Sequence, residues 1–175
     1  DEWKVVRNGA GAALKWWKHK SGTPEHIDFD MTCRDVWERD YRPLLVDFDR
    51  ERVGDPAAAA KSLASRREQG KWACYGSQFV WENMRASMGD YTMYTALLTD
   101  PDWIHDFCRV YTDLYLKGYE ILIAEGGLPD GMWLYEDLGY RDRLFCRPET
   151  LAELIFPYYA EVVSFFHDHD VPVIL

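Results

Sequence analysis

Short apolar runs bounded by turn residues open the chain, and longer runs with helical spacing follow them. Residues 3–7 and 12–17 are rich in aromatic and β-branched side chains, and the Asn8-Gly9 pair between them is a strong turn signal. Residues 27–31 are a further short possible strand. These features predict an N-terminal β-hairpin followed by another short strand.

Two proline-containing starts mark the clearest helices. Asp55-Pro56 and Asp100-Pro101 each place a capping carboxylate before a proline that suits the first helical turn. Gly70 closes the first of these helices. The second helix carries apolar residues at helical spacing from Trp103 to Ile121. A third helix begins at Pro148, with Leu151, Ile155, Tyr158, Val162 and Phe166 on one face.

Weaker signals predict the remaining helix boundaries. Thr32 is placed to cap a helix that runs to about Arg39, and Ser77 to cap one that runs to Met88. Gly89 would end the latter helix. Pro157 lies inside the helix from Pro148 and should kink it, because proline removes one backbone donor.

Strands at residues 71–75, 132–135 and 171–175 alternate with these helices. Such alternation is typical of an α/β fold with a mainly parallel sheet and helices outside it. We expect one domain, in which a hairpin extension (residues 1–22) precedes the strand–helix units (residues 23–175). A (β/α)8 TIM barrel takes about 250 residues, so the chain is expected to form part of one. The alternative is a small open α/β sheet.

Charge and cysteine usage narrow the classes of partner. A net charge of −10 disfavours nucleic acid and anionic membrane surfaces. No run approaches the roughly 20 apolar residues of a membrane span. The cysteines are dispersed and form no metal-binding pair, which is typical of reduced thiols in a cytoplasmic protein.

Glu136 and Asp137 are the first candidate catalytic residues, because they follow a predicted strand and chemistry gathers at strand ends in β/α proteins. Burial beside aromatic residues would raise a carboxyl pKa and suit proton transfer. Adjacent residues point in opposite directions, so at most one should face the barrel axis. The alternative is a turn-capping pair, or an ion pair with Arg141 or Arg143. Glu82 could be a further carboxylate of the same cleft, or a solvent-facing glutamate near a helix start.

Ser77 and Tyr135 lie at the ends of predicted strands and are candidates for binding a cofactor. No histidine or aspartate is placed to turn Ser77 into a nucleophile. His167 and His169 are two residues apart and cannot share a helix face, so we predict no metal site there.

The segment YEDLGYRDRLFCRPETLAELIFPYY resembles the DD-hydrophobic-G, SPE and PYY pattern of the uroporphyrinogen decarboxylase-like superfamily. The order of elements is similar from about Gly22 to Leu175. The superfamily consists of (β/α)8 barrels and includes porphyrinogen decarboxylases and zinc- and corrinoid-linked methyltransferases. The resemblance implies that this chain is an internal portion of such a barrel, with its mouth near Met31, Ser77 and Glu136.

Two departures from the superfamily bear on the expected activity. The arginine-rich motif of the decarboxylases has no match here, which favours the methyltransferase branch. In that branch zinc is held by a His-x-Cys after a barrel strand, and residues 172–175 would lead into it. The resemblance therefore implies zinc ligands outside this chain and a corrinoid methyl donor.

We therefore expect a methyltransferase that moves a methyl group to a metal-activated thiol. It would take a small-molecule substrate and could use a corrinoid protein as partner. One alternative is a decarboxylase (lyase) acting on a tetrapyrrole. The other is a non-catalytic α/β module that binds a partner or forms a homo-oligomer, since open sheets expose edges that proteins normally cover.

Overall fold

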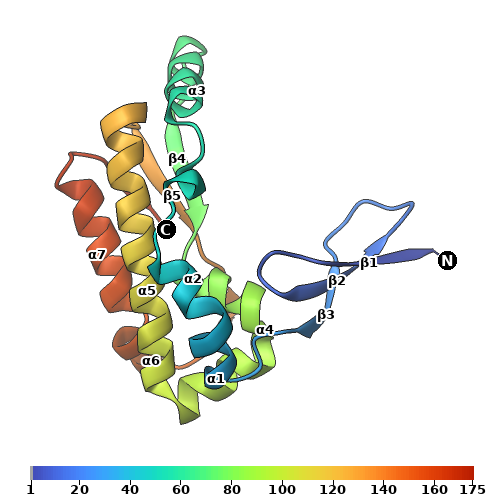
Figure 1. The fold of residues 1–175 in the computed structure, drawn as a ribbon. Coiled ribbons are helices and arrows are strands. Elements are labelled where there is room, and N and C mark those ends of the chain that lie inside the picture. Colours follow the sequence, from blue (N-terminus) through green and yellow to red (C-terminus); the bar gives the residue numbers. More distant parts are fainter. Residues whose placement is uncertain (1) are drawn as a thin grey trace.

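The computed structural model describes residues 2–175, and its helices lie beside two main sheets that are not joined to each other (Figure 1). The fold is mixed α/β, with an antiparallel sheet at the N-terminus and a small parallel sheet in the body. Across residues 2–175 the parallel sheet stays open and closes no barrel. The predicted α/β class is therefore confirmed.

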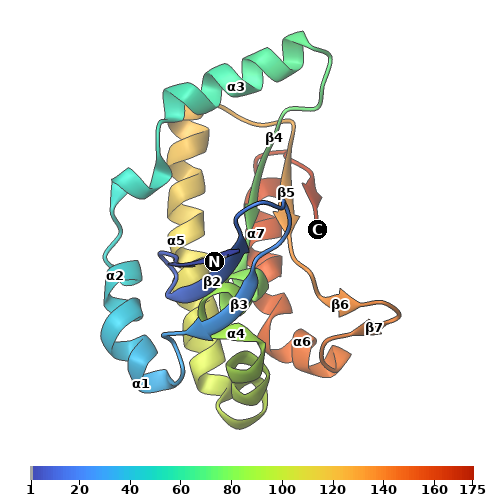
Figure 2. The same ribbon diagram turned by 90° about the vertical axis from the view of Figure 1, so that its right-hand side faces the viewer.

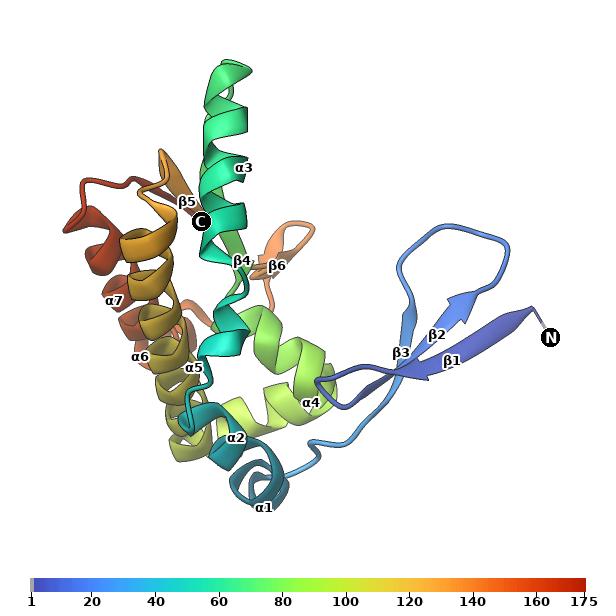
Figure 3. The ribbon, with the colours of Figure 1, turned by 45° about the horizontal axis from the view of Figure 1, so that its top comes forward.

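The N-terminal sheet contains β1 (Trp3–Arg7), β2 (Ala12–Trp17) and β3 (Glu25–Phe29), paired in that order. The side chain of Asn8 holds the turn between β1 and β2, because its Oδ1 accepts hydrogen bonds from the amides of Ala10 and Ala12 at 3.0 and 2.9 Å. The predicted hairpin is confirmed. Figures 1 and 3 show that this sheet projects from the helical body.

The body sheet contains three parallel strands, with β5 in the centre. They are β4 (Cys74–Gln78), β5 (Gly131–Tyr135) and β8 (Val173–Ile174). A small hairpin of β6 (Gly139–Tyr140) and β7 (Arg143–Leu144) follows β5. The predicted order of these three strands is confirmed, although β4 begins three residues later than the run of apolar residues suggests. The strand predicted at residues 27–31 is instead β3, which pairs antiparallel with β2 and belongs to the N-terminal sheet, not to the strand–helix units.

The helical segments connect these strands in chain order. They are α1 (Arg34–Val36), η1 (Trp37–Tyr41), α2 (Arg42–Val46), η2 (Arg50–Val53), α3 (Pro56–Glu68), α4 (Val80–Thr99), α5 (Pro101–Ile121), η3 (Leu122–Gly126), α6 (Pro148–Leu154) and α7 (Phe156–His167). Both aspartate caps are confirmed. Asp55 accepts from the amide of Ala57 at 2.9 Å, and Asp100 accepts from the amide of Trp103 at 3.2 Å.

Three predicted helix boundaries were wrong. Cys33 rather than Thr32 occupies the N-cap of α1, without a side-chain capping bond. Ser77 lies within β4 and does not cap α4, whose N-cap residue is Phe79. Gly89 breaks the helix without ending it, because its φ of 71° bends α4 while the helical hydrogen bonding resumes beyond it.

Helices cover only one face of the parallel sheet. Met132 and Leu134 of β5 are buried in the core, whereas the alternating side chains of Trp133 and Tyr135 are 50% and 47% exposed. In Figure 1, α5 and α7 lie to the left of β4 and β5 and the N-terminal sheet projects to the right; Figure 2 looks at the molecule from that right-hand side. The sheet therefore has a packed face and a bare face.

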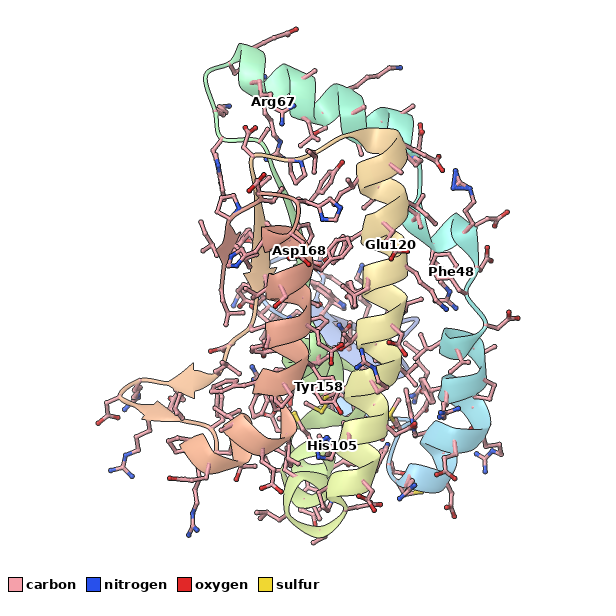
Figure 4. All side chains as sticks on the ribbon, turned by 90° about the vertical axis from the view of Figure 1, so that its left-hand side faces the viewer. Phe48, Arg67, His105, Glu120, Tyr158 and Asp168 are labelled. Atoms are coloured by element: carbon pink, nitrogen blue, oxygen red, sulfur yellow. The ribbon has the colours of Figure 1, made fainter. Side chains whose placement is uncertain are left out.

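The helix layer is held together by the contact between α5 and α7. Figure 4 shows Tyr158 of α7 beside His105 of α5, and the tyrosine hydroxyl is 2.9 Å from the Nδ1 atom of the histidine. The five apolar residues predicted for one face after Pro148 are all buried. The helix is interrupted at Ile155, two residues before Pro157. The predicted kink therefore separates α6 from α7. No helix in residues 2–175 is long and apolar enough to cross a membrane.

Candidate functional site

The end of β5 directs neighbouring side chains to opposite faces of the sheet. Glu136 follows the alternation of Met132 and Leu134 and enters the helix layer, whereas Asp137 follows Tyr135 toward the bare face. The two carboxylates therefore point to opposite faces of the sheet, as expected for adjacent residues, and Asp137 is on the face that the helices leave bare.

Glu136 occupies a closed niche at the start of α4. Its Oε1 accepts a hydrogen bond from the amide of Phe79 at 2.6 Å, and its Oε2 accepts one from the amide of Trp81 at 2.9 Å. The hydroxyl of Tyr159 donates to Oε2 as well. Phe79 provides no side-chain cap, so a carboxylate from another element caps the free amides of α4.

Burial raises the pKa of Glu136 to about 7, because desolvation of the carboxylate outweighs the hydrogen bonds from Tyr159 and the amides. Burial also raises the pKa of Tyr159, and the adjacent Glu136 charge raises it further. The niche could therefore hold a proton near neutral pH. The carboxylate of Glu136, the hydroxyl of Tyr159 and the first amides of α4 bind one another. Capping of the helix is therefore enough to explain why these groups are buried together.

A cavity of about 470 Å³ opens at the C-terminal ends of β4 and β5, on the bare face of the sheet. Gln78 and Tyr135, which are paired across the two strands, form its floor together with Asp137. The side chains that line the rest come from α4 and from β3 with its preceding loop: Glu82, Arg85, Ala86 and Asp90, and Thr23, His26 and Phe29. The projecting N-terminal sheet thus supplies one wall.

Arg85 links the carboxylates of this cavity. Its guanidinium lies 3.0 Å from Glu82, 3.0 Å from Asp90 and 3.4 Å from Asp137. Burial acts to lower the pKa of Arg85, but the hydrogen bond to Asp90 and the neighbouring negative charges raise it overall. Asp137 has the longest of these contacts and its side chain is 47% exposed, so it is free to meet a ligand.

Three of the predicted site residues meet in this cavity and two do not. Asp137, Glu82 and Tyr135 line it together. Glu136 is buried in its niche. Ser77 faces the helix layer, where its hydroxyl hydrogen-bonds to that of Tyr119 on α5. The roles assigned to these residues remain predictions. Met31, expected near the mouth, is fully buried in the core.

Arg85 and the ring pair of His26 and Phe29 also line the cavity and are not among the predicted site residues. Arg85 lies three residues after Glu82 on α4, a spacing that places both on one helix face. That signal was available in the sequence. The pair on β3 was not, because its place beside the cavity depends on how the N-terminal sheet packs against α4.

The described residues supply no zinc centre. Among residues 2–175, no three His, Cys, Asp or Glu side chains are grouped so that they could hold a metal ion. His167 and His169 do not converge, and the Nδ1 atom of His169 lies 2.8 Å from the carbonyl oxygen of Phe165. The zinc that the resemblance implies would have its ligands outside this chain, and its presence stays a prediction.

Comparison with known proteins adds no relative. No family model matches the chain, and neither a curated protein nor a solved structure is significantly similar to it. The fold and the site together define a mixed α/β protein with a cavity at the ends of its parallel strands, and ionisable side chains line that cavity.

Proposed function

We propose that this chain forms part of a (β/α)8 barrel of the uroporphyrinogen decarboxylase-like superfamily and serves methyl transfer in its corrinoid-linked branch. The observation that carries the proposal is the place of the cavity. It lies at the C-terminal ends of parallel strands, on the face that helices leave bare. In a closed barrel that face is the interior, and those strand ends form the active-site mouth.

The charge of the cavity favours methyl transfer over decarboxylation of a tetrapyrrole. Glu82, Asp90 and Asp137 line it, and Arg85 already contacts all three carboxylates. A porphyrinogen with several carboxylate groups would meet repulsion here, and no second arginine lines the cavity within the described residues. The alternative lyase activity is therefore less well supported.

The residues of this chain bind and position the substrate in this proposal. Asp137, Tyr135 and Gln78 present polar groups from the strand ends, and Arg85 holds Asp137 in place. Glu136 fixes the start of α4, which carries Glu82 and Arg85. We assign no step to a metal ion, because the described groups do not form a site for one.

The test is a methyl-transfer assay on the protein expressed from its full reading frame. Methylcobalamin and a small thiol such as 2-mercaptoethanol are the reactants, and the visible spectrum of the corrinoid reports demethylation. We expect turnover that Asp137→Asn reduces by about tenfold to a hundredfold, which corresponds to the loss of one charged contact in the transition state. No turnover, together with decarboxylation of uroporphyrinogen, would transfer the assignment to the lyase branch.

A specific observation also supports a second candidate, a non-catalytic assembly module. Within residues 2–175 the outer edges of β4 and β8 are unpaired, and the nearby side chains of Trp133, Ile174 and Leu175 are at least half exposed. Such edges and apolar surface are commonly covered by another chain. A stable oligomer without methyl transfer or decarboxylation would support this candidate.

A further inference from the structure

The cavity at the ends of β4 and β5 is walled by aromatic rings on two sides. Tyr135 rises from β5 and is 47% exposed. On the β3 side, His26 and Phe29 stack with ring centroids 5.8 Å apart and planes inclined by 22°. A volume of about 470 Å³ lies within the range of small-molecule sites. The hollow is therefore large enough for an organic ligand, which its rings can contact.

The ionisable groups of the cavity are unevenly balanced. Three carboxylates face one guanidinium, and each of the three is within 3.4 Å or less of Arg85. A single positive charge cannot neutralise three negative ones, so the hollow keeps an excess of negative charge. Its partly buried walls weaken screening by solvent, and this favours a ligand that brings positive charge.

A metal ion is the wrong kind of cation for this arrangement. The carboxylates are spread around Arg85 and do not converge on one point, and residues 2–175 contain no grouping of metal ligands. An organic ammonium spreads its charge over several carbon atoms and is attracted to the faces of aromatic rings. Rings on two walls with a nearby carboxylate are the groups that recognise such a cation.

We propose that the cavity binds a small organic cation of the methylated ammonium class. The inference rests on the proposed function, in which this cavity is the small-molecule site, and it names the class of ligand that the site takes. Asp137 supplies the countercharge, Tyr135 and the His26–Phe29 pair contact the methyl groups, and Arg85 is a positioning residue that orients Asp137.

The experiment measures how tightly the full chain binds two probes of the same shape. Choline carries a quaternary ammonium, whereas 3,3-dimethylbutan-1-ol replaces the nitrogen with carbon and is neutral. Titrations followed by calorimetry or by NMR should give at least about tenfold tighter binding of choline. Succinate, a dianion, should not bind.

Two matched variants test the residues. Asp137→Asn should weaken choline binding by about tenfold while leaving the affinity for the neutral alcohol unchanged. Asp168→Asn is the control, because Asp168 is exposed at the C-terminal end of α7 (Figure 4) and does not line the cavity. Equal affinity for choline and the alcohol, preference for succinate, failure of all probes to bind, or an unchanged Asp137→Asn variant would each overturn the inference.

The failure of this inference can be distinguished from failure of the proposed function. Choline binding that depends on Asp137, in a protein without methyl transfer, would support the cation site and reject the enzyme. Methyl transfer without preference for the cationic probe would support the enzyme and overturn the cation site.

Discussion

Glu136 and Asp137 are neighbours in the chain but belong to different regions of the molecule. Glu136 is enclosed by the start of α4 and by Tyr159, and both of its oxygens are hydrogen-bonded. Asp137 lies in an open cavity, and within residues 2–175 its one ion pair is with Arg85 at 3.4 Å. The period of two along an extended strand is enough to produce this difference.

A carboxyl group with a perturbed pKa is not by itself a catalytic one. Burial raises the pKa of Glu136 to about 7, which would make it an attractive acid or base if proton affinity were the only criterion. Its place in the fold is that of a helix cap supplied by another strand. Asp137 has the access to solvent and to ligand that chemistry needs.

Replacing Glu136 should break the closed region and have the largest effect. Glu136→Ala leaves the amides of Phe79 and Trp81 and the hydroxyl of Tyr159 without their buried acceptor. We expect the free energy of unfolding to fall by about 4 kcal/mol, as measured by urea denaturation. Glu149→Ala, at an exposed position in the first turn of α6, is the control and should cost little. A loss below about 1 kcal/mol would show that the niche contributes little to stability.

The pH dependence of stability should identify the same group. The folded chain holds the proton of Glu136 more tightly than the unfolded chain, because its pKa is raised from 4.5 to about 7. This contribution is fully present below the unfolded pKa and is lost as the pH rises through the folded pKa. Between about pH 4 and pH 8 the wild type should lose up to about 3 kcal/mol relative to Glu136→Gln. The free energies of unfolding of the wild type and of Glu136→Gln, measured across this pH range, give this loss as the change in their difference. Parallel pH profiles of the two proteins would contradict the raised pKa.

A substitution at Gly89 should disturb the open region alone. Its φ is 71°, and an added Cβ would lie 2.4 Å from the ring of Phe29. We expect Gly89→Ala to lower the free energy of unfolding by about 2 kcal/mol and to displace the β3 wall of the cavity. Gly118→Ala in α5 is the matched control, since nothing lies within 4 Å of its added Cβ, and it should stabilise by about 0.5 to 1 kcal/mol. Thermal unfolding measures the stability of both variants. Similar changes in the two would refute the close contact between position 89 and the ring of Phe29.

Removing the charge of Asp137 should have the smallest effect on stability. Its side chain is 47% exposed and its contact with Arg85 is long, so Asp137→Asn should change the free energy of unfolding by no more than about 0.5 kcal/mol. The same variant should bind choline about tenfold more weakly than the wild type. A strongly destabilised Asp137→Asn would mean that this carboxylate is structural as well.

The sequence could predict the elements that depend on local chemistry. The Asn8 turn and the Asp55 and Asp100 caps are made by residues within four positions of the groups they bind. The helical spacing after Pro101 corresponds to the buried face in the first half of α5, up to Val110, whereas Ile121 at the end of the series is only half-buried. The alternation of strands and helices likewise predicted that the strands of the body sheet are parallel.

Features that depend on distant residues could not be predicted in the same way. Ser77 appears suited to cap α4, but the capping carboxylate is Glu136, which is more than fifty positions further along the chain. The cavity is likewise built from the N-terminal sheet, α4 and the strand ends, which only the fold brings together. Because Glu136 and Asp137 are adjacent, the sequence predicted that their side chains point to opposite faces of the sheet. It did not predict which of the two faces the cavity.

Carboxyl labelling tests the central comparison most directly. The native chain is treated with a water-soluble carbodiimide and glycinamide, and mass spectrometry of the proteolytic peptides then measures modification at each residue. We predict that Asp137 is labelled at a rate typical of exposed carboxylates, while Glu136 stays protected until the chain is unfolded. Equal labelling of the two residues in the native state, or faster labelling of Glu136, would contradict the division of the site into a closed niche and an open cavity.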